Sequence, residues 1–101
     1  MGFCIYLENE DCEPLEQVED PENILHQLLP SEDTSYQHLR FIDWYGDTVF
    51  NRLQIQPFLG EWDRIIESAR TPEEHALLAR IRELALRCSK KPHLYLRFSG
   101  D

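Results

Sequence analysis

Residues 43–51 hold the densest set of side chains that could take part in chemistry. They include two carboxylates, a phenol and a carboxamide, namely Asp43, Asp47, Tyr45 and Asn51. Two neighbouring carboxylates can bind a cation or share a proton. Asp side chains in turns also commonly accept hydrogen bonds from backbone N–H groups, so the same residues are typical of a well-formed turn. We treat the four residues as an alternative ligand site, for which the sequence offers no further metal ligand nearby.

The stretch ENEDCEPLEQVEDPEN, residues 8–23, concentrates charge of one sign. It contains eight carboxylates and no Lys or Arg. Like charges at this density favour a solvated loop, which we expect at residues 8–19. A carboxylate-rich segment can also steer a cationic partner toward the protein. The candidate partner-binding residues are Glu8, Glu10, Asp11, Glu13, Glu16, Glu19 and Asp20.

Signatures of catalysis are absent from the sequence. It contains no glycine-rich phosphate loop, no nucleophile elbow and no HExxH metal motif. The four histidines are scattered, and each fits a surface or half-buried polar residue better than a metal ligand. We therefore predict no catalytic residue, no metal site and no cofactor, although acid and base groups could still converge from distant positions.

Length and composition predict one domain spanning residues 1–101. A content of 42% hydrophobic and 11% aromatic residues is sufficient for a packed core. The three cysteines, Cys4, Cys12 and Cys88, cannot all pair within one chain and match no zinc spacing. No run approaches the roughly 18 apolar residues of a membrane span, and residues 1–10 have no basic n-region and too short an apolar run, so we expect no signal peptide. A cytoplasmic protein with reduced thiols is expected.

The net charge of −9 is unevenly distributed. Residues 1–50 carry twelve carboxylates and one base, whereas residues 51–101 carry seven carboxylates and nine bases. An acidic surface repels nucleic acid and anionic membranes and favours basic proteins. Because the two halves carry charge of opposite sign, the acidic half of one copy could also pair with the basic half of another in a homodimer.

The hydrophobic pattern predicts four strands. Residues 2–7 form a short apolar run, expected to be buried on both faces. Residues 37–55 indicate a hairpin that turns at residues 44–47, with Gly46 in the left-handed conformation. Residues 93–98 alternate, which places Leu94, Leu96 and Phe98 on one face.

Three helices are predicted to begin with the same device, a proline at the first helical position. Asp20-Pro21 opens the first and Gln56-Pro57 the second. Thr71-Pro72 opens the third, where Glu74 completes a capping box. The resulting order is β-α-β-β-α-α-β. It predicts an α+β fold with a small, mostly antiparallel sheet, helices on one face, and at least one terminal strand in the centre.

The segment FIDWYGDTVFNRLQ, residues 41–54, resembles a motif of small bacterial proteins of unknown function. Their I-D-x-Y-G-D-T-V-F-N core is followed by two helices and a closing strand, and the resemblance covers residues 39–101. It implies a bacterial cytoplasmic origin and a shared α+β fold. It also marks Asp43, Tyr45, Gly46, Asp47 and Asn51 as the place of any shared site, but it implies no activity and no ligand.

Two functions are consistent with these patterns. The first is a small acidic, non-enzymatic protein that docks on a basic protein, as an immunity protein or antitoxin does when it masks a nuclease. The second is a small-molecule or metal-binding protein that uses the region Asp43–Asn51, an alternative that includes an enzyme.

Overall fold

The computed structural model describes residues 2–100, which form four strands, three α-helices and one short 3₁₀ helix. In chain order these are β1 (Cys4–Glu8), β2 (Pro14–Glu19), α1 (Ile24–Leu28), η1 (Leu39–Phe41), β3 (Asp47–Asn51), α2 (Arg52–Ser68), α3 (Pro72–Lys90) and β4 (Tyr95–Ser99).

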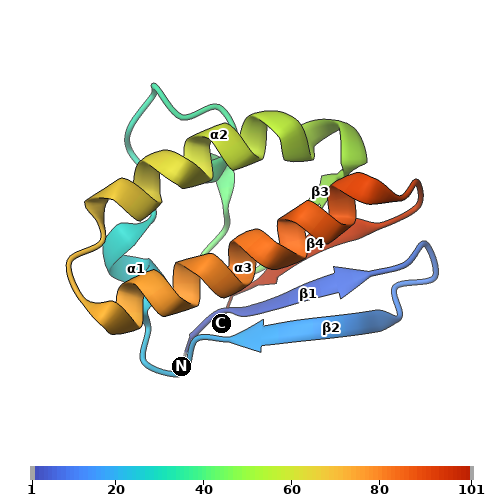
Figure 1. The fold of residues 1–101 in the computed structure, drawn as a ribbon, viewed down its shortest axis with the longest axis horizontal. Coiled ribbons are helices and arrows are strands. Elements are labelled where there is room, and N and C mark those ends of the chain that lie inside the picture. Colours follow the sequence, from blue (N-terminus) through green and yellow to red (C-terminus); the bar gives the residue numbers. More distant parts are fainter. Residues whose placement is uncertain (1, 101) are drawn as a thin grey trace.

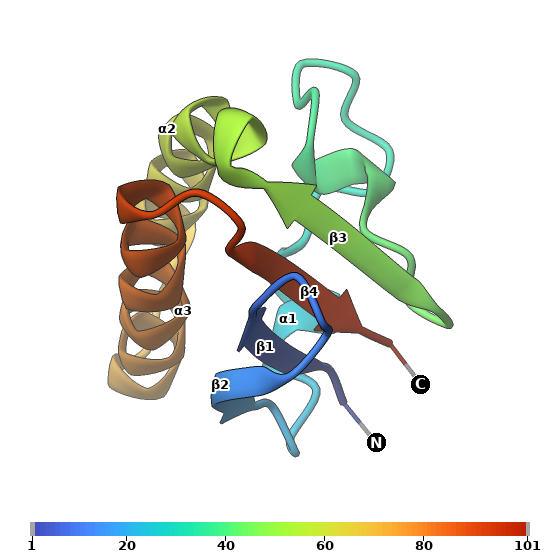
Figure 2. The same cartoon turned by 90° about the vertical axis from the view of Figure 1, so that its right-hand side faces the viewer.

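All four strands belong to one antiparallel sheet with the order β2-β1-β4-β3. The two long helices α2 and α3 lie side by side on one face of this sheet (Figures 1 and 2). The predicted α+β fold with helices on one face is confirmed. Both terminal strands occupy the centre, as expected from their apolar sequences.

The central strand β1 has one buried face rather than two. Ile5 and Leu7 point into the core, where no more than 3% of either is exposed, whereas Cys4 and Tyr6 are half-buried on the opposite face. The expectation of burial on both faces was therefore wrong. Since no layer formed by residues 2–100 packs against the second face, its side chains form a surface that we call the open face.

The acidic segment 8–19 is not a loop. Residues 14–19 form β2, which pairs with β1 in a register that opposes Val18 to Ile5 and shifts at Leu7/Glu8. Glu and Pro are unfavourable in strands, and only Val18 among the residues of β2 is buried. The neighbouring strand supplies the pairing that local propensity does not, so the observed order is β-β-α-β-α-α-β.

The predicted hairpin of residues 37–55 was also wrong in its first half. Leu39–Phe41 form the 3₁₀ helix η1, with Leu39 buried and Phe41 60% exposed. No glycine among residues 2–100 has a positive φ, so Gly46 is not left-handed. Gly46 instead allows close approach, because a Cβ there would lie 2.8 Å from Oδ2 of Asp43. Residues 47–51 do form the expected second strand.

Glu61 of α2 holds this irregular segment in place. Its two carboxylate oxygens accept hydrogen bonds from the backbone N–H groups of Gln37, His38 and Leu39 at 2.8–3.0 Å. Nδ1 of His38 lies 3.3 Å from Oε2 of the same carboxylate. Partial burial opposes ionisation of Glu61, but these hydrogen bonds outweigh it, and the pKa of Glu61 is lowered.

The helices begin with side-chain caps, though not always where the prolines predict. Thr71 caps α3 as expected, and Oγ1 accepts from the Glu74 N–H at 3.1 Å. The predicted capping box is not formed, because the Glu74 carboxylate accepts from the N–H of Arg70 and not from that of Thr71. In α2 the capping box is made by Asn51 and Gln54, five residues before the predicted start, so Pro57 lies inside the helix.

Among residues 2–100, no helix combines the length and the apolar character needed to cross a membrane.

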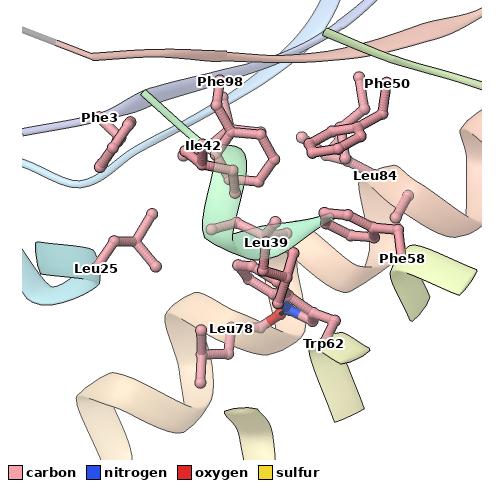
Figure 3. Packing of buried hydrophobic residues seen from close by; sticks show 14 of the residues in the cluster. Phe3, Leu25, Leu39, Ile42, Phe50, Phe58, Trp62, Leu78, Leu84 and Phe98 are labelled. Atoms are coloured by element: carbon pink, nitrogen blue, oxygen red, sulfur yellow. Dashed lines mark hydrogen bonds between the residues drawn. The ribbon is translucent and has the colours of Figure 1, made fainter. Parts of the chain in front are cut away.

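Aromatic side chains fill the space between the helices and the sheet (Figure 3). Phe58 and Trp62 of α2 stack with ring centroids 5.2 Å apart, and Phe98 of β4 lies 6.0 Å from both. The indole N–H of Trp62 donates to the Leu78 carbonyl of α3 at 3.0 Å. This bond ties α2 to α3 inside the core. The core lies between the helices and one face of the sheet, so the open face on the other side remains available for contacts.

Candidate functional site

Two of the seven acidic residues predicted to bind a partner are used inside the protein. Glu8 is 3% exposed, and its carboxylate forms an ion pair with the guanidinium of Arg97. Asp20 is 2% exposed and accepts hydrogen bonds from the N–H groups of Ile24 and Leu25 at 2.9 and 2.8 Å. The predicted helix start at Asp20-Pro21 is wrong, because α1 begins at Ile24 with Asn23 as its N-cap, but the Asp20 carboxylate still accepts from the first N–H groups of the helix.

The other five acidic residues lie at the surface. Glu16 pairs with Arg87 of α3, and Glu10 lies 3.3 Å from Nδ1 of His93. Asp11, Glu13 and Glu19 form no ion pair among residues 2–100 within the 4.0 Å limit for such pairs. The tip of the β1–β2 hairpin, at the right of Figure 1, and the free edge of β2 lie at the surface. Their exposed acidic residues therefore keep an excess of negative charge there.

The residues of the alternative ligand site do not converge on one cavity. Oδ1 of Asp43 accepts from the Tyr45 N–H at 2.8 Å, and the Asp43 N–H donates to Oγ1 of Thr48. Oδ1 of Asn51 caps α2 through the N–H groups of residues 53 and 54. Tyr45 is 80% exposed. Asp43 and Asn51 thus stabilise a turn and a helix end, and Asp47 alone of the four lies at the site described next.

A cleft of about 510 Å³ lies on the open face beside the β1–β2 hairpin. It is lined by Glu8, Asn9, Glu10, Cys12, Asp47, Val49, Tyr95 and Arg97. Its residues come from β1, the hairpin turn, β3 and β4. The cleft therefore brings Glu8 and Glu10 of the acidic segment together with Asp47 of the second candidate region.

Arg97 occupies the centre of the open face. In the strand register it stands opposite Tyr6 on one side and Val49 on the other. Its Nη2 lies 2.9 Å from Oε2 of Glu8, and its Nη1 lies 3.4 Å from Oδ1 of Asp47. The guanidinium carbon is also 4.4 Å from the centre of the Tyr6 ring. Arg97 thereby fixes the carboxylates of two neighbouring strands.

The charges of the cleft favour a cationic ligand. The lining of the cleft includes three carboxylates, of Glu8, Glu10 and Asp47, and one guanidinium, of Arg97. The hydrogen bond to Glu8 raises the pKa of Arg97, which stays charged. Glu8 is neutralised by Arg97, whereas Glu10 and Asp47 have side chains 61% and 58% exposed and can meet a further cation. The side chains of Val49 and Tyr95 contribute apolar surface to the wall of the cleft.

Sequence reasoning did not select Arg97, Tyr95 or Val49. Arg97 is the only base in the strand of residues 93–98, which is otherwise apolar, apart from the histidine at its start. A charged residue at that place in a central strand needs a partner on a neighbouring strand. That signal was available, but the partners Glu8 and Asp47 could be named only once the strand order was known.

No group of three or more His, Cys, Asp or Glu residues that could hold a metal ion occurs in the part of the chain that the structure describes. Burial raises the pKa of the Cys88 thiol to about 11, which keeps it protonated. Cys12 is exposed at the rim of the cleft.

No protein-family model matches this chain, and no significant match to it was found among curated proteins or among solved structures. The geometry of the open face is therefore the basis for assigning a function.

Proposed function

We propose that this is a non-enzymatic binding protein that docks on a basic protein partner in the cytoplasm. The observation that carries the proposal is the cleft of the open face. It presents the exposed carboxylates of Glu10 and Asp47 beside apolar surface from Val49 and Tyr95. A lysine or arginine side chain of the partner fits these groups, because its apolar stem and cationic head match the wall and the carboxylates.

The surrounding charge supports this reading. Asp11, Glu13 and Glu19 lie exposed on the hairpin that forms one side of the cleft. Charges placed in this way raise the rate at which a basic protein meets the surface, and salt weakens the effect. An immunity protein or antitoxin that masks the phosphate-binding groove of a nuclease is the kind of protein this surface suits. The motif of residues 41–54 adds the expectation of a bacterial source.

The test is capture of partners from a lysate of the source cell on immobilised protein. We expect a protein with a basic isoelectric point that is retained at low salt and released near 1 M salt, where the Debye length is about 3 Å. The double variant Glu10→Gln, Asp47→Asn should lose most of the capture. The matched control Glu32→Gln, Glu67→Gln makes the same change in net charge at exposed positions outside the cleft.

Equal loss of capture in both double variants would show that net charge acts without the cleft. A captured partner that is acidic, or that resists 1 M salt, would contradict the proposal itself.

A further inference from the structure

The free edge of β2 and the neighbouring surface of α3 form a second binding feature. We infer that this edge accepts an extended basic segment of a partner protein as a fifth strand. The inference goes beyond the cleft and rests on the proposed function only in that the partner is a basic protein.

The backbone of β2 is open to pairing. The Asp20 N–H donates to the Phe3 carbonyl at 2.9 Å, so the backbone groups of Asp20 face β1. Backbone direction alternates along a strand, so the groups of Gln17 and Glu19 point away from the sheet. Among residues 2–100 no strand lies beyond β2, and both views show this side of the sheet uncovered (Figures 1 and 2).

A groove runs between this edge and α3. One hollow of about 340 Å³ is lined from β2 by Glu16, Gln17 and Val18, and from α3 by residues between Ala79 and Arg87. A second hollow of about 290 Å³ continues past Glu19 toward the first turn of α3. Arg80 borders both. Val18, Leu77 and Leu84 are buried beneath the groove and provide apolar contact for alternate side chains of an added strand.

The net negative charge of the groove favours a basic occupant. Its exposed ionic groups are five carboxylates and two guanidinium groups, namely Glu16, Glu19, Glu22, Glu73, Glu83, Arg80 and Arg87. A basic segment complements this excess of negative charge. A second copy of the chain would bring another acidic edge, and its net charge of −9 opposes that pairing.

The opposite edge of the sheet is less available. The segment before β3 folds back beside it, where the Asp43 N–H donates to Oγ1 of Thr48 at 2.8 Å. The ring centroids of His38 and Phe50 also lie 6.2 Å apart. A partner segment at this edge would meet residues 38–43, whereas no segment among residues 2–100 lies beside the outer edge of β2, which makes β2 the more accessible edge.

The experiment selects ligands from a library of random twelve-residue peptides displayed on phage, at low salt, and then measures amide hydrogen exchange of the full chain with the enriched peptides. We expect basic peptides with alternating aliphatic residues. Exchange of the Gln17 and Glu19 amides should slow at least ten-fold on binding. The variant Gln17→Pro should weaken binding at least ten-fold, because it removes a donor that points away from the sheet. Gln17→Val keeps that donor and should bind as the wild type does.

Enriched peptides that are not basic, or that leave exchange at Gln17 and Glu19 unchanged, would overturn the inference, as would an absence of enriched peptides. Peptides that instead protect amides near Val49 and Tyr95 would also overturn it, while they support the proposed function at the cleft. If Gln17→Pro proves to be unfolded by circular dichroism, exchange in the wild-type chain decides the outcome.

Discussion

Nη2 of Arg97 lies 2.9 Å from Oε2 of Glu8, and the pair joins the two central strands across the open face. The Glu8 side chain is only 4% exposed and that of Arg97 24%. A charge at such a position is tolerated when a partner neutralises it, and loss of the partner leaves it uncompensated. The relationship therefore makes Glu8 a structural residue rather than a free docking group.

Replacement of Glu8 should destabilise the fold. We expect Glu8→Gln to lower the free energy of unfolding by about 1–3 kcal/mol, because Arg97 then faces a neutral amide and its remaining carboxylate partner is Asp47 at the longer distance of 3.4 Å. Urea unfolding at neutral pH measures the change. Asp11→Asn, at an exposed position of the hairpin turn, should change the free energy of unfolding by no more than about 0.5 kcal/mol. Equal stability of both variants would mean that Arg97 is held by other contacts.

Glu61 should make stability depend on pH. Its folded-state pKa is lowered, so its contribution is complete above the ordinary glutamate pKa of about 4.3 and is lost as the pH falls through the lower folded value. Glu61→Gln should therefore cost about 1–3 kcal/mol at pH 7 and progressively less as the pH falls below about 4. Chemical unfolding of both proteins across this range measures the difference. A difference that stays constant with pH would show that the charge of Glu61 is not what holds residues 37–39.

Asn51 should act on helix α2 and not on a ligand. Its Oδ1 accepts from the N–H groups of Leu53 and Gln54, both at 3.0 Å. Asn51→Ala should lower the free energy of unfolding by about 1 kcal/mol, and Asn51→Asp should restore most of it, because Asp is an equally good cap. Thermal or urea unfolding serves as the measurement. Under conditions where the protein is folded, Asn51→Ala should not affect capture of the basic partner. Loss of capture by this variant would indicate that Asn51 belongs to the binding site.

The thiols should differ in reactivity. Cys88 is buried with a pKa raised to about 11, whereas Cys12 is exposed. With a thiol-specific disulfide reagent at pH 8, Cys12 should react within minutes and Cys88 only after unfolding in denaturant. Mass spectrometry of the digested protein identifies the modified residue. Rapid modification of Cys88 in the folded protein would indicate that α3 opens locally from the sheet.

Local sequence predicted the elements whose residues carry their own signal. Thr71 and Pro72 mark the beginning of α3, and the alternation of Leu96 and Phe98 marks β4. The prediction failed for β2, which contains one buried apolar residue, Val18. It failed as well for the predicted strand that contains Leu39–Phe41, where the backbone is fixed by Glu61, some twenty residues away in sequence.

The sequence by itself determined the class of fold, because burial of apolar residues at helical and strand spacing allows few arrangements of so short a chain. It also determined the acidic character of the first half of the protein. Only the tertiary structure decided which carboxylates remain free, since ion pairs such as Glu8–Arg97 and Glu16–Arg87 join residues more than seventy positions apart. Strand order places these groups in contact, and strand order depends on packing of the whole core rather than on any local pattern.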